Sequence, residues 1–513
     1  MDPLVSILRN GSLLGGAQIV SSLVAMVLMV VVSRTLGDVE FGRLYLALTL
    51  SAIVGVVVDV GLSQVVTRVV AREPALARPY LRRAAIVVAI LGALLYVLLL
   101  GVAQALGYTA EVRFLVAILG LLMVAEGFAQ LLAAVYQAHE RMLVPALARV
   151  IGNVAMVALV VPLLSRGYGA AMVAAVMVLA SCLRLALTGV TLGRLTGFRQ
   201  RPPSPPSWRD LLRAGLPFLA AQGLGIFVIR IDVVILGQMA DEATVGWYGA
   251  ASRVVEAFNF IPLVLTTATF PVASRLWVTS AAEFQATVRK TLHLLLVITV
   301  PVAVTLFALA DEIVGFLFTL ASYAPAVPIL RVQAVSLGLV YVDYLLVCIL
   351  MAIGRERRWI AFVAASCLLN PAINWLLIPA AAASLGNGAI GAAVGKLVTE
   401  VLFLVCTLRA LPSGIFGAES RRVAARAVAL GVLLGAFLFG SRTLGAPWML
   451  AAVLGGGGYL AAVLRTGLLP PDVTGWIAGS LLRRDRTGAA PGGPTELQPA
   501  LAGAEGPRSA DAA

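Results

Sequence analysis

Residues 227–237 read FVIRIDVVILG, an apolar run interrupted by one arginine and one aspartate. This run lies inside a longer apolar stretch at 214–238, which is long enough for a helix to cross a hydrocarbon core of roughly 30 Å. On such a helix Arg230 and Asp232 are about 200° apart, so they cannot neutralise each other. Each charge therefore needs a partner on another helix, or water.

The composition places this helix in a membrane protein. Of the 513 residues, 60% are hydrophobic and 12% are charged, and the mean hydropathy is +0.98. A soluble protein cannot bury that much apolar surface. The net charge of +13 does not indicate nucleic-acid binding, because the basic residues lie in short clusters between apolar runs, as membrane insertion requires. We therefore predict an all-α polytopic membrane protein.

The sequence contains no motif that indicates a metal, a cofactor or bond chemistry. The four cysteines are far apart without a CxxC pair, and His139 and His293 are the two histidines. No P-loop of the form GxxxxGK[ST] occurs, and no constellation suggests catalysis. The N-terminal apolar run has no convincing cleavage site and is interpreted as a retained first helix. We predict no cofactor, no metal site and no enzymatic activity.

Apolar runs between charged or Pro/Gly breaks predict about fourteen transmembrane helices. They lie near 12–33, 44–66, 84–107, 114–136, 143–165, 168–192, 214–238, 245–272, 292–310, 325–351, 359–380, 388–408, 427–441 and 446–464. A proline-rich basic stretch, RQRPPSPPSWR at 199–209, separates the first six helices from the others. The predicted domains are an N-terminal six-helix lobe at 1–195, a cytoplasmic linker at 196–212, a C-terminal six-helix lobe at 213–412, two additional helices at 413–470 and a mostly disordered cytoplasmic tail at 471–513.

The distribution of Lys and Arg predicts the orientation of these helices. With the N-terminus in the cytoplasm, the loops on the inner side hold 21 Lys and Arg residues and those on the outer side hold 5. A miscounted span in the middle of the chain would destroy this imbalance. Both termini are therefore predicted to be cytoplasmic, in a multi-pass protein of the inner (plasma) membrane.

The two six-helix sets align weakly as a repeat. A shift of 204 residues superimposes the start of the first span on the start of the seventh without a gap. The matched pairs are Ala17 and Ala221, Gln18 and Gln222, Gly42 and Gly246, and Ala47 and Ala251. Because each half has an even number of spans, the implied geometry is a parallel repeat with a pseudo-two-fold axis along the membrane normal.

Two stretches of the sequence resemble a known family. SRTLGDVEFGRLYLALTL (33–50), followed by DVGLSQVVTRVVARE (59–73), resembles the opening of bacterial oligosaccharide flippases, and residues 229–276 resemble their seventh and eighth helices. These flippases belong to the multidrug/oligosaccharidyl-lipid/polysaccharide exporter superfamily, which also holds lipid II flippases and multidrug extruders. The resemblance implies two six-helix lobes around a central cavity, lined mainly by spans one, two, seven and eight.

The resemblance further implies a transporter that flips a polyprenyl-diphosphate-linked oligosaccharide to the outer leaflet for cell-surface polysaccharide biosynthesis. We expect alternating access, driven by an H⁺ or Na⁺ gradient or by the membrane potential. The expected partners are this lipid-linked sugar, membrane lipids and the coupling ion, and the protein is expected to be a monomer. Two alternatives are a cation-coupled exporter of drugs or small amphiphiles and, from another class, an integral-membrane glycosyltransferase or polymerase.

The charges inside the spans are the candidate site residues. A charge at a helix centre costs roughly 2.5–3.5 kcal/mol on insertion scales, so such residues usually face water or a partner helix. Guanidinium groups suit a diphosphate because their planar forks donate paired, charge-assisted hydrogen bonds. The predicted headgroup contacts are Arg230, Arg34, Arg68 and Arg253, and the predicted ion-coupling residues are Asp232, Glu256 and Asp59.

Simpler structural roles are also open for these residues. The two charges of span seven could form interhelical pairs, and Arg253 and Glu256, spaced i, i+3, could pair on one face. Arg34 could snorkel at a helix end, and Arg68 could set the topology. Asn259 and Pro262 predict a kink in the eighth span.

Several other charges lie within predicted spans. Lys396 and Glu400 are spaced i, i+4, which favours a local ion pair. Five charges have no such neighbour on their own helices, and their roles stay open: Glu126, Arg149, Arg184, Arg331 and Asp343.

Overall fold

The computed structural model describes residues 3–193, 207–412 and 414–468, with side chains from Val24 onward, and this part of the chain is all-helical. Thirteen of its segments are long and apolar enough to cross a membrane. The first segment, Val24–Arg72, has 49 residues and joins the end of the predicted span at 12–33 to the whole of that at 44–66, which accounts for the difference from fourteen. The predicted fold class is therefore confirmed.

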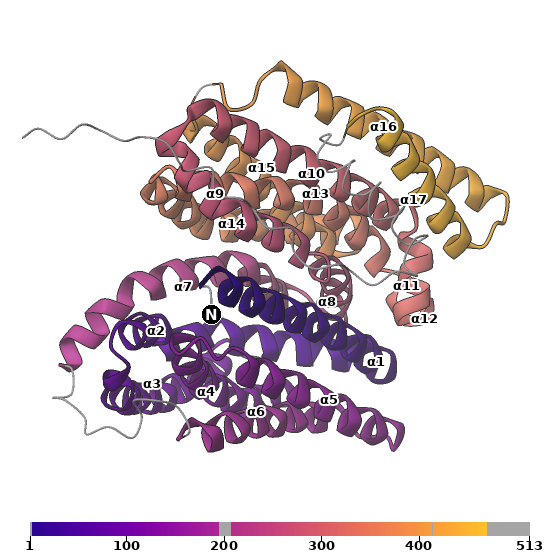
Figure 1. The fold of residues 1–513 in the computed structure, drawn as a ribbon. Coiled ribbons are helices and arrows are strands. Elements are labelled where there is room, and N and C mark those ends of the chain that lie inside the picture. Colours follow the sequence, from indigo (N-terminus) through magenta and orange to yellow (C-terminus); the bar gives the residue numbers. More distant parts are fainter. Residues whose placement is uncertain (1–2, 194–206, 413, 469–513) are drawn as a thin grey trace, which may run out of the picture. The chain divides into compact units, whose positions relative to one another are not determined.

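The helices follow one another with short connections (Figure 1). Those before the gap at 194–206 are α1 (Pro3–Asp59), α2 (Leu62–Arg72), the 3₁₀ turn η1 (Pro74–Leu76), α3 (Ala77–Ala105), α4 (Ala110–Ala138), α5 (Leu143–Ser165) and α6 (Ala170–Leu192). Those after the gap are α7 (Trp208–Met239), α8 (Glu242–Glu256), α9 (Phe260–Thr279), α10 (Ala281–Ala308), α11 (Ala310–Phe318), α12 (Leu320–Tyr323), α13 (Ala326–Ala352), α14 (Glu356–Leu385), α15 (Gly388–Ala410), α16 (Ala418–Thr443) and α17 (Trp448–Arg465).

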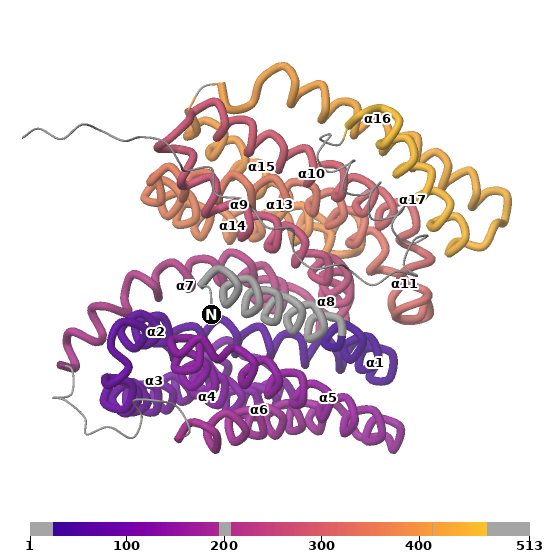
Figure 2. The backbone as a smooth tube through the Cα atoms, viewed as in Figure 1, coloured from indigo at the N-terminus to yellow at the C-terminus, as the bar shows by residue number. Residues whose placement is uncertain are grey.

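Helix α1 contains two helices that meet at Gly37. The backbone there has φ 78° and ψ 179°, which glycine adopts readily. Figure 2 shows α1 turning back on itself. A second break follows at Val60 and Gly61, with φ 47° and 69°. Asp59 stabilises the start of α2 at this break, because its carboxylate accepts from the Ser63 amide at 3.2 Å and the Ser63 hydroxyl at 2.5 Å.

The predicted span at 245–272 is likewise broken into two helices. Helix α8 ends at Glu256 and α9 begins at Phe260, with a turn at 257–259. Pro262 lies in the first turn of α9. Amides in the first turn have no acceptor within the helix, so the missing amide hydrogen of proline costs no helical hydrogen bond there. The kink predicted from Asn259 and Pro262 is therefore confirmed.

The contacts among helices show how the two halves of the sequence meet. Helix α1 packs against α3, α4, α5 and α6, and also against α7 and α8. Helix α7 additionally packs against α14 and α15, so α7 and α8 connect the early helices to the later ones. Helices α16 and α17 pack against each other and against α10 (Figure 1). The predicted lobe boundaries remain a prediction; most of the linker at 196–212 and all of the tail at 471–513 lie outside the described residues.

The two helices matched by the 204-residue shift cross at a pair of glycines, which we call the glycine seam (Gly42 and Gly246). A Cβ atom on Gly42 would lie 1.8 Å from the carbonyl oxygen of Glu242, and one on Gly246 would lie 2.1 Å from that of Asp38. Asp38 and Glu242 are themselves 204 residues apart. The contact is therefore reciprocal, as in a two-fold interface.

Hydrogen bonds beside the glycine seam follow the same symmetry. Arg43 Nε donates to Glu242 Oε2 at 2.6 Å, and Trp247 Nε1 donates to Asp38 Oδ2 at 2.9 Å. Arg43 and Trp247 are again 204 residues apart, so each repeat supplies one donor and one acceptor. These reciprocal contacts support the predicted parallel repeat.

Candidate functional site

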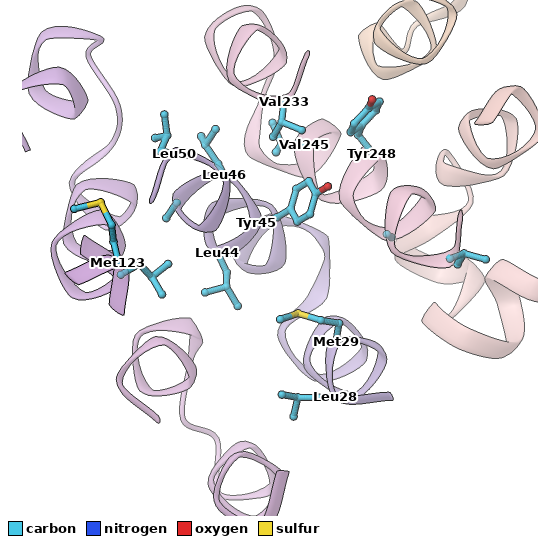
Figure 3. Packing of buried hydrophobic residues seen from close by; sticks show 14 of the residues in the cluster. Leu28, Met29, Leu44, Tyr45, Leu46, Leu50, Met123, Val233, Val245 and Tyr248 are labelled. Atoms are coloured by element: carbon cyan, nitrogen blue, oxygen red, sulfur yellow. The ribbon is translucent and has the colours of Figure 1, made fainter. Parts of the chain in front are cut away.

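The charged residues of span seven meet those of span eight next to the glycine seam, in a group that we call the charged cluster (Tyr45, Arg230, Asp232, Tyr248, Arg253 and Glu256). Arg230 Nη1 donates to Glu256 Oε1 at 2.8 Å and to the Tyr45 hydroxyl at 3.1 Å. Figure 3 shows Tyr45 reaching from α1 toward α8. Arg230 is thus held between α1 and α8.

Arg253 makes the second contact to the same carboxylate. Its Nη1 donates to Glu256 Oε2 at 3.1 Å, and its guanidinium lies over the Tyr45 ring, 5.2 Å from the ring centre. The Nε atoms of Arg230 and Arg253 are buried and have no hydrogen-bond partner among the described residues. Two guanidinium groups therefore share one carboxylate and retain unused donors. The i, i+3 pair of Arg253 and Glu256 agrees with the structural role that the sequence left open.

Asp232 has its own partners. Its side chain is 1% exposed and accepts from the Tyr248 hydroxyl and, at 2.9 Å, from the Val233 amide. The positive charge of Lys396 on α15 acts on both Asp232 and Glu256. The two charges of span seven thus find separate partners off their own faces, as the 200° separation predicts.

Lys396 differs from its prediction. Among the ion pairs of the described residues there is none between Lys396 and Glu400. Its charge acts instead on the charged cluster, because α15 packs against α7 and α8. The i, i+4 spacing made a local pair possible, but the charge of Lys396 also lies within the influence of the buried Asp232 and the partly buried Glu256.

Arg68 lines a separate cavity of about 520 Å³ between α2, α4, α5 and α6, which we call the arginine cavity. Arg149 also lines it, and the Arg68 guanidinium lies 5.8 Å from the centre of the Phe218 ring on α7. Arg184, also in the wall, is paired with Glu126. The arginine cavity is thus a polar space with two further guanidinium groups beside that pair.

Asp59 lines a neighbouring cavity of about 340 Å³ between α1, α4 and α7. Glu126 and Gln130 belong to the walls of both cavities, so the two spaces are adjacent. Arg34 is exposed on α1 three residues before Gly37, and no contact of the described residues joins it to the charged cluster. The structure therefore brings together four of the seven predicted site residues, and places Asp59, Arg68 and Arg34 elsewhere.

Three residues of the site carried no clear signal in the sequence. Tyr45 and Tyr248 each come from a helix other than that of the charge they contact, and Lys396 on α15 acts on Asp232 through its charge. The one available hint is that Tyr45 matches Gly249 in the 204-residue shift. A Cβ atom on Gly249 would lie 2.7 Å from the Tyr45 ring, so this glycine makes room for the tyrosine.

A third space, which we call the apolar groove, has a volume of about 530 Å³ and lies between α10, α13 and α16. Thr299 is the one polar residue among those lining it, and the others are aliphatic, glycine or phenylalanine. Gly431 and Gly435 on α16 face this groove, where larger side chains would narrow it. The groove therefore suits a hydrocarbon chain and not a charged group.

The family comparison decides the identity of the chain. A model of the family described as polysaccharide biosynthesis protein matches residues 7–277, which is more than half of the chain. The chain belongs to this family. No curated protein sequence matches it.

Solved structures with the same fold are membrane transporters. The chain is similar to the lipid II flippase MurJ in an inward closed conformation, with a TM-score of 0.69 and 13% identity over 88% of this chain and 99% of that one. It is also similar to an inward-facing multidrug resistance MATE family transporter of the MOP superfamily, with a TM-score of 0.65 and 17% identity over 76% and 94%. A third similar structure is a MOP superfamily transporter from Pyrococcus furiosus, with a TM-score of 0.55 and 16% identity over 80% and 96%.

Family and fold together define the broad class of this polysaccharide biosynthesis protein. It belongs to the polysaccharide biosynthesis protein family and has the multi-pass helical fold of MurJ and of the MATE transporters of the MOP superfamily. The resemblance noted in residues 33–50, 59–73 and 229–276 is confirmed. Roles for individual residues, the coupling ion and the orientation of the termini stay predictions.

Proposed function

We propose that this protein flips a polyprenyl-diphosphate-linked oligosaccharide from the cytoplasmic to the outer leaflet. The observation that carries this proposal is the sharing of Glu256 by Arg230 and Arg253. One carboxylate cannot neutralise two guanidinium groups, and both retain an unpartnered Nε donor. A diphosphate offers several anionic oxygens to such donors, and charge-assisted bonds to phosphate are among the strongest that arginine makes.

The apolar groove supports a substrate that also has a long hydrocarbon tail. It lies on α10, α13 and α16, away from the charged cluster on α1, α7 and α8. An amphiphile could therefore place its charged headgroup and its tail in different parts of the protein. The similar fold of MurJ, named as a lipid II flippase, is consistent with a lipid-linked substrate.

The glycine seam supports alternating access as the mechanism. With the N-terminus in the cytoplasm, the turn at Gly37 follows one span and lies on the outer side. The seam therefore closes the outer ends of α8 and of the part of α1 that follows Gly37. Small residues let the helices meet backbone to backbone, and Arg43 and Trp247 add two hydrogen bonds. The separation of these two helices would open a path to the outer leaflet.

The remaining predicted residues take positions along this path. Arg68, in the arginine cavity, would meet the headgroup before the charged cluster does, and Arg34 would meet it near the outer end. Asp232, Glu256 and Asp59 stay the predicted ion-coupling residues, for H⁺ or Na⁺. Both cavities of the early helices are bordered by residues of α7, which also carries Arg230.

The test is a leaflet assay on purified protein in vesicles. A polyprenyl-diphosphate oligosaccharide is placed in one leaflet, and a membrane-impermeant sugar-modifying reagent reports its arrival in the other. We expect wild type to move this lipid and the Arg230→Gln/Arg253→Gln variant to move it at least about tenfold more slowly, since each charge-assisted bond contributes about 1.5–3 kcal/mol. Arg421→Gln, an exposed arginine on α16, is the matched control.

The choice of substrate sharpens the same assay. A glycolipid with the same tail and sugar but no diphosphate should move slowly in wild type and be insensitive to the two arginine substitutions. Equal movement of the neutral and the diphosphate lipid would contradict the role of the charged cluster. Movement of cationic drugs without movement of either lipid would favour the drug-exporter alternative.

A further inference from the structure

Helix α3 carries two exposed arginines at the start of an exposed apolar stripe. Arg78 and Arg82 are spaced i, i+4, so they lie on one face of the helix. The same face continues along α3 with exposed apolar side chains, which are Ile86, Ile90, Leu94 and Val97. In a helix that crosses a membrane, such a stripe faces hydrocarbon. The two arginines therefore lie at the end of the lipid-facing surface of α3.

A groove begins beside these arginines, and we call it the basic groove. It has a volume of about 330 Å³ and lies between α3 and α4. Arg78 and Arg82 line it, and every other residue of its wall is apolar, including Ala85 on α3 and Phe128 on α4. Ala85 is seven residues beyond Arg78, which is about 10 Å of helical rise. The groove thus has positive charge at one end and apolar walls further along.

The two arginines lack an anionic partner in the described part of the chain. No ion pair or hydrogen bond of the described residues includes either of them. Like charges at i, i+4 repel each other, so an anion that bridges them would stabilise this end of α3. The neighbouring Arg83 is different, because its guanidinium lies over the Trp208 ring on α7, 4.8 Å from the ring centre.

We propose that the basic groove binds one anionic phospholipid of the cytoplasmic leaflet. Its phosphate would lie between Arg78 and Arg82, and one acyl chain would follow the apolar walls formed by α3 and α4. Guanidinium groups donate paired, charge-assisted hydrogen bonds to phosphate oxygens. Basic pockets between transmembrane helices on the cytoplasmic side suit anionic lipid headgroups. With the predicted orientation, α3 begins on that side.

This site is separate from the spaces described above. The arginine cavity uses another face of α4, through Gln130 and Ala133, and the apolar groove lies between α10, α13 and α16. The lipid would join the cytoplasmic ends of α3 and α4, which pack against each other. It is a fixed ligand and not the transported one, so the proposal does not rest on the proposed flipping function.

The first test measures lipid binding by the purified full-length chain in a neutral detergent. Phosphatidylglycerol is added, bound lipid is counted by native mass spectrometry, and thermal unfolding reports the stabilisation. We expect Arg78→Gln/Arg82→Gln to bind this lipid about 30-fold more weakly than wild type, which is about 2 kcal/mol for two basic residues near a membrane surface.

The matched control removes two other exposed arginines. Arg421→Gln/Arg422→Gln, at the start of α16, makes the same change in net charge. This variant should bind phosphatidylglycerol as wild type does. Equal binding by wild type and the Arg78→Gln/Arg82→Gln variant would overturn the site. An equal loss in the α16 variant would overturn it too, because the effect would then come from net charge and not from the groove.

The apolar walls are tested without a change in charge. Ala85→Leu keeps both arginines and fills part of the groove, and each methylene group of the lipid that it displaces should weaken binding about fourfold. Ala93→Leu, exposed two turns further along α3 and outside the wall of the groove, should bind as wild type does. Unchanged binding by Ala85→Leu would overturn the position of the acyl chain.

The choice of ligand completes the test. Phosphatidylcholine, with the same tails but no net charge, should bind more weakly than phosphatidylglycerol, and glycerol 3-phosphate, which lacks tails, should not raise the unfolding temperature. Stabilisation by glycerol 3-phosphate as large as that by phosphatidylglycerol would overturn the proposal in favour of a soluble anion. Preferential binding of a polyprenyl diphosphate would overturn it by making the groove an entrance for the transported lipid.

Discussion

The glycine seam and the charged cluster lie on the same helices, yet they treat the repeat in opposite ways. At the seam, Gly42 and Gly246 occupy matched positions and make reciprocal contacts. In the cluster, the matches of Arg230 and Asp232 are Met26 and Leu28. The repeat thus built the contact between the halves, whereas the charges belong to the second half alone.

The change from symmetry to asymmetry occurs within one helical turn. Ala47 and Ala251 are matched and both fully buried. Two residues earlier in each repeat, however, Tyr45 faces its own match, Gly249. The tyrosine ring fills the space that the glycine leaves and brings its hydroxyl to Arg230. Similarly, Arg253 and Glu256 match Thr49 and Ala52. Symmetric packing suits a gate, and an asymmetric charge suits a single anionic ligand.

The largest expected effect comes from removal of the shared carboxylate. Glu256→Ala should leave Arg230 and Arg253 as two neighbouring, partly buried cations, at a cost of up to about 3–5 kcal/mol in the free energy of unfolding. Arg230→Ala should cost less, because Glu256 keeps Arg253. Thermal unfolding in detergent measures both. Equal destabilisation by the two substitutions would mean that Glu256 does not hold the two arginines together.

The second prediction concerns the glycine seam. Gly246→Ala places a Cβ atom 2.1 Å from the carbonyl oxygen of Asp38. Such overpacking destabilises the helix contact by about 1–3 kcal/mol. If this cost falls on the closed state alone, the populations of closed and open protein shift about 5- to 150-fold. Cysteine accessibility in the helix segment 38–46, measured in vesicles, reports the opening.

Symmetry supplies the control for the seam. Gly42→Ala should increase accessibility to a similar extent, since the same crossing is affected from the other side. Gly440→Ala on α16, where a Cβ atom would meet nothing within 4 Å, should have no effect. A response at one of the two seam glycines alone would show that the reciprocal contact is not the gate.

The sequence predicted the features that depend on one helix or on repeated residues. The spans, the kink at Asn259 and Pro262, and the match of Gly42 with Gly246 all follow from local pattern or from self-comparison. The i, i+3 pair of Arg253 and Glu256 is of the same kind. Such features need no knowledge of how helices rotate against each other.

The rest of the site depends on that rotation. The Arg230 partners, Tyr45 and Glu256, lie 185 and 26 residues away on two other helices. The i, i+4 spacing of Lys396 and Glu400 predicted an ion pair that is absent from the described residues. For charges inside a membrane, the cost of an unpaired group is high enough that tertiary partners override local ones.

The third prediction extends the comparison to helices that have no match in the first half. Gly435→Leu on α16 should fill part of the apolar groove. If a lipid tail lies there, the loss of contact for two or three methylene groups weakens binding by about 2 kcal/mol. Flipping of a long polyprenyl substrate should slow, while a short-chain analogue with the same headgroup should be affected little. An equal effect on both would place the tail outside the groove.

The smallest effect is expected at the C-terminal end of α16. Arg442 on α16 contacts Asp311 at 2.9 Å and Glu312 at 2.9 Å, and Arg331 on α13 also contacts Asp311 at 2.6 Å. The Arg442 side chain is 39% exposed and that of Asp311 is 33% exposed, so solvent screens the pair. Arg442→Gln should therefore change the free energy of unfolding by at most about 1 kcal/mol, decreasing further in high salt. A loss as large as that of Glu256→Ala would mean that the attachment of α16 and α17, and not the charged cluster, dominates the stability of the second half. The contrast between a screened surface network and a partly buried carboxylate shared by two arginines is thus measurable within a single chain.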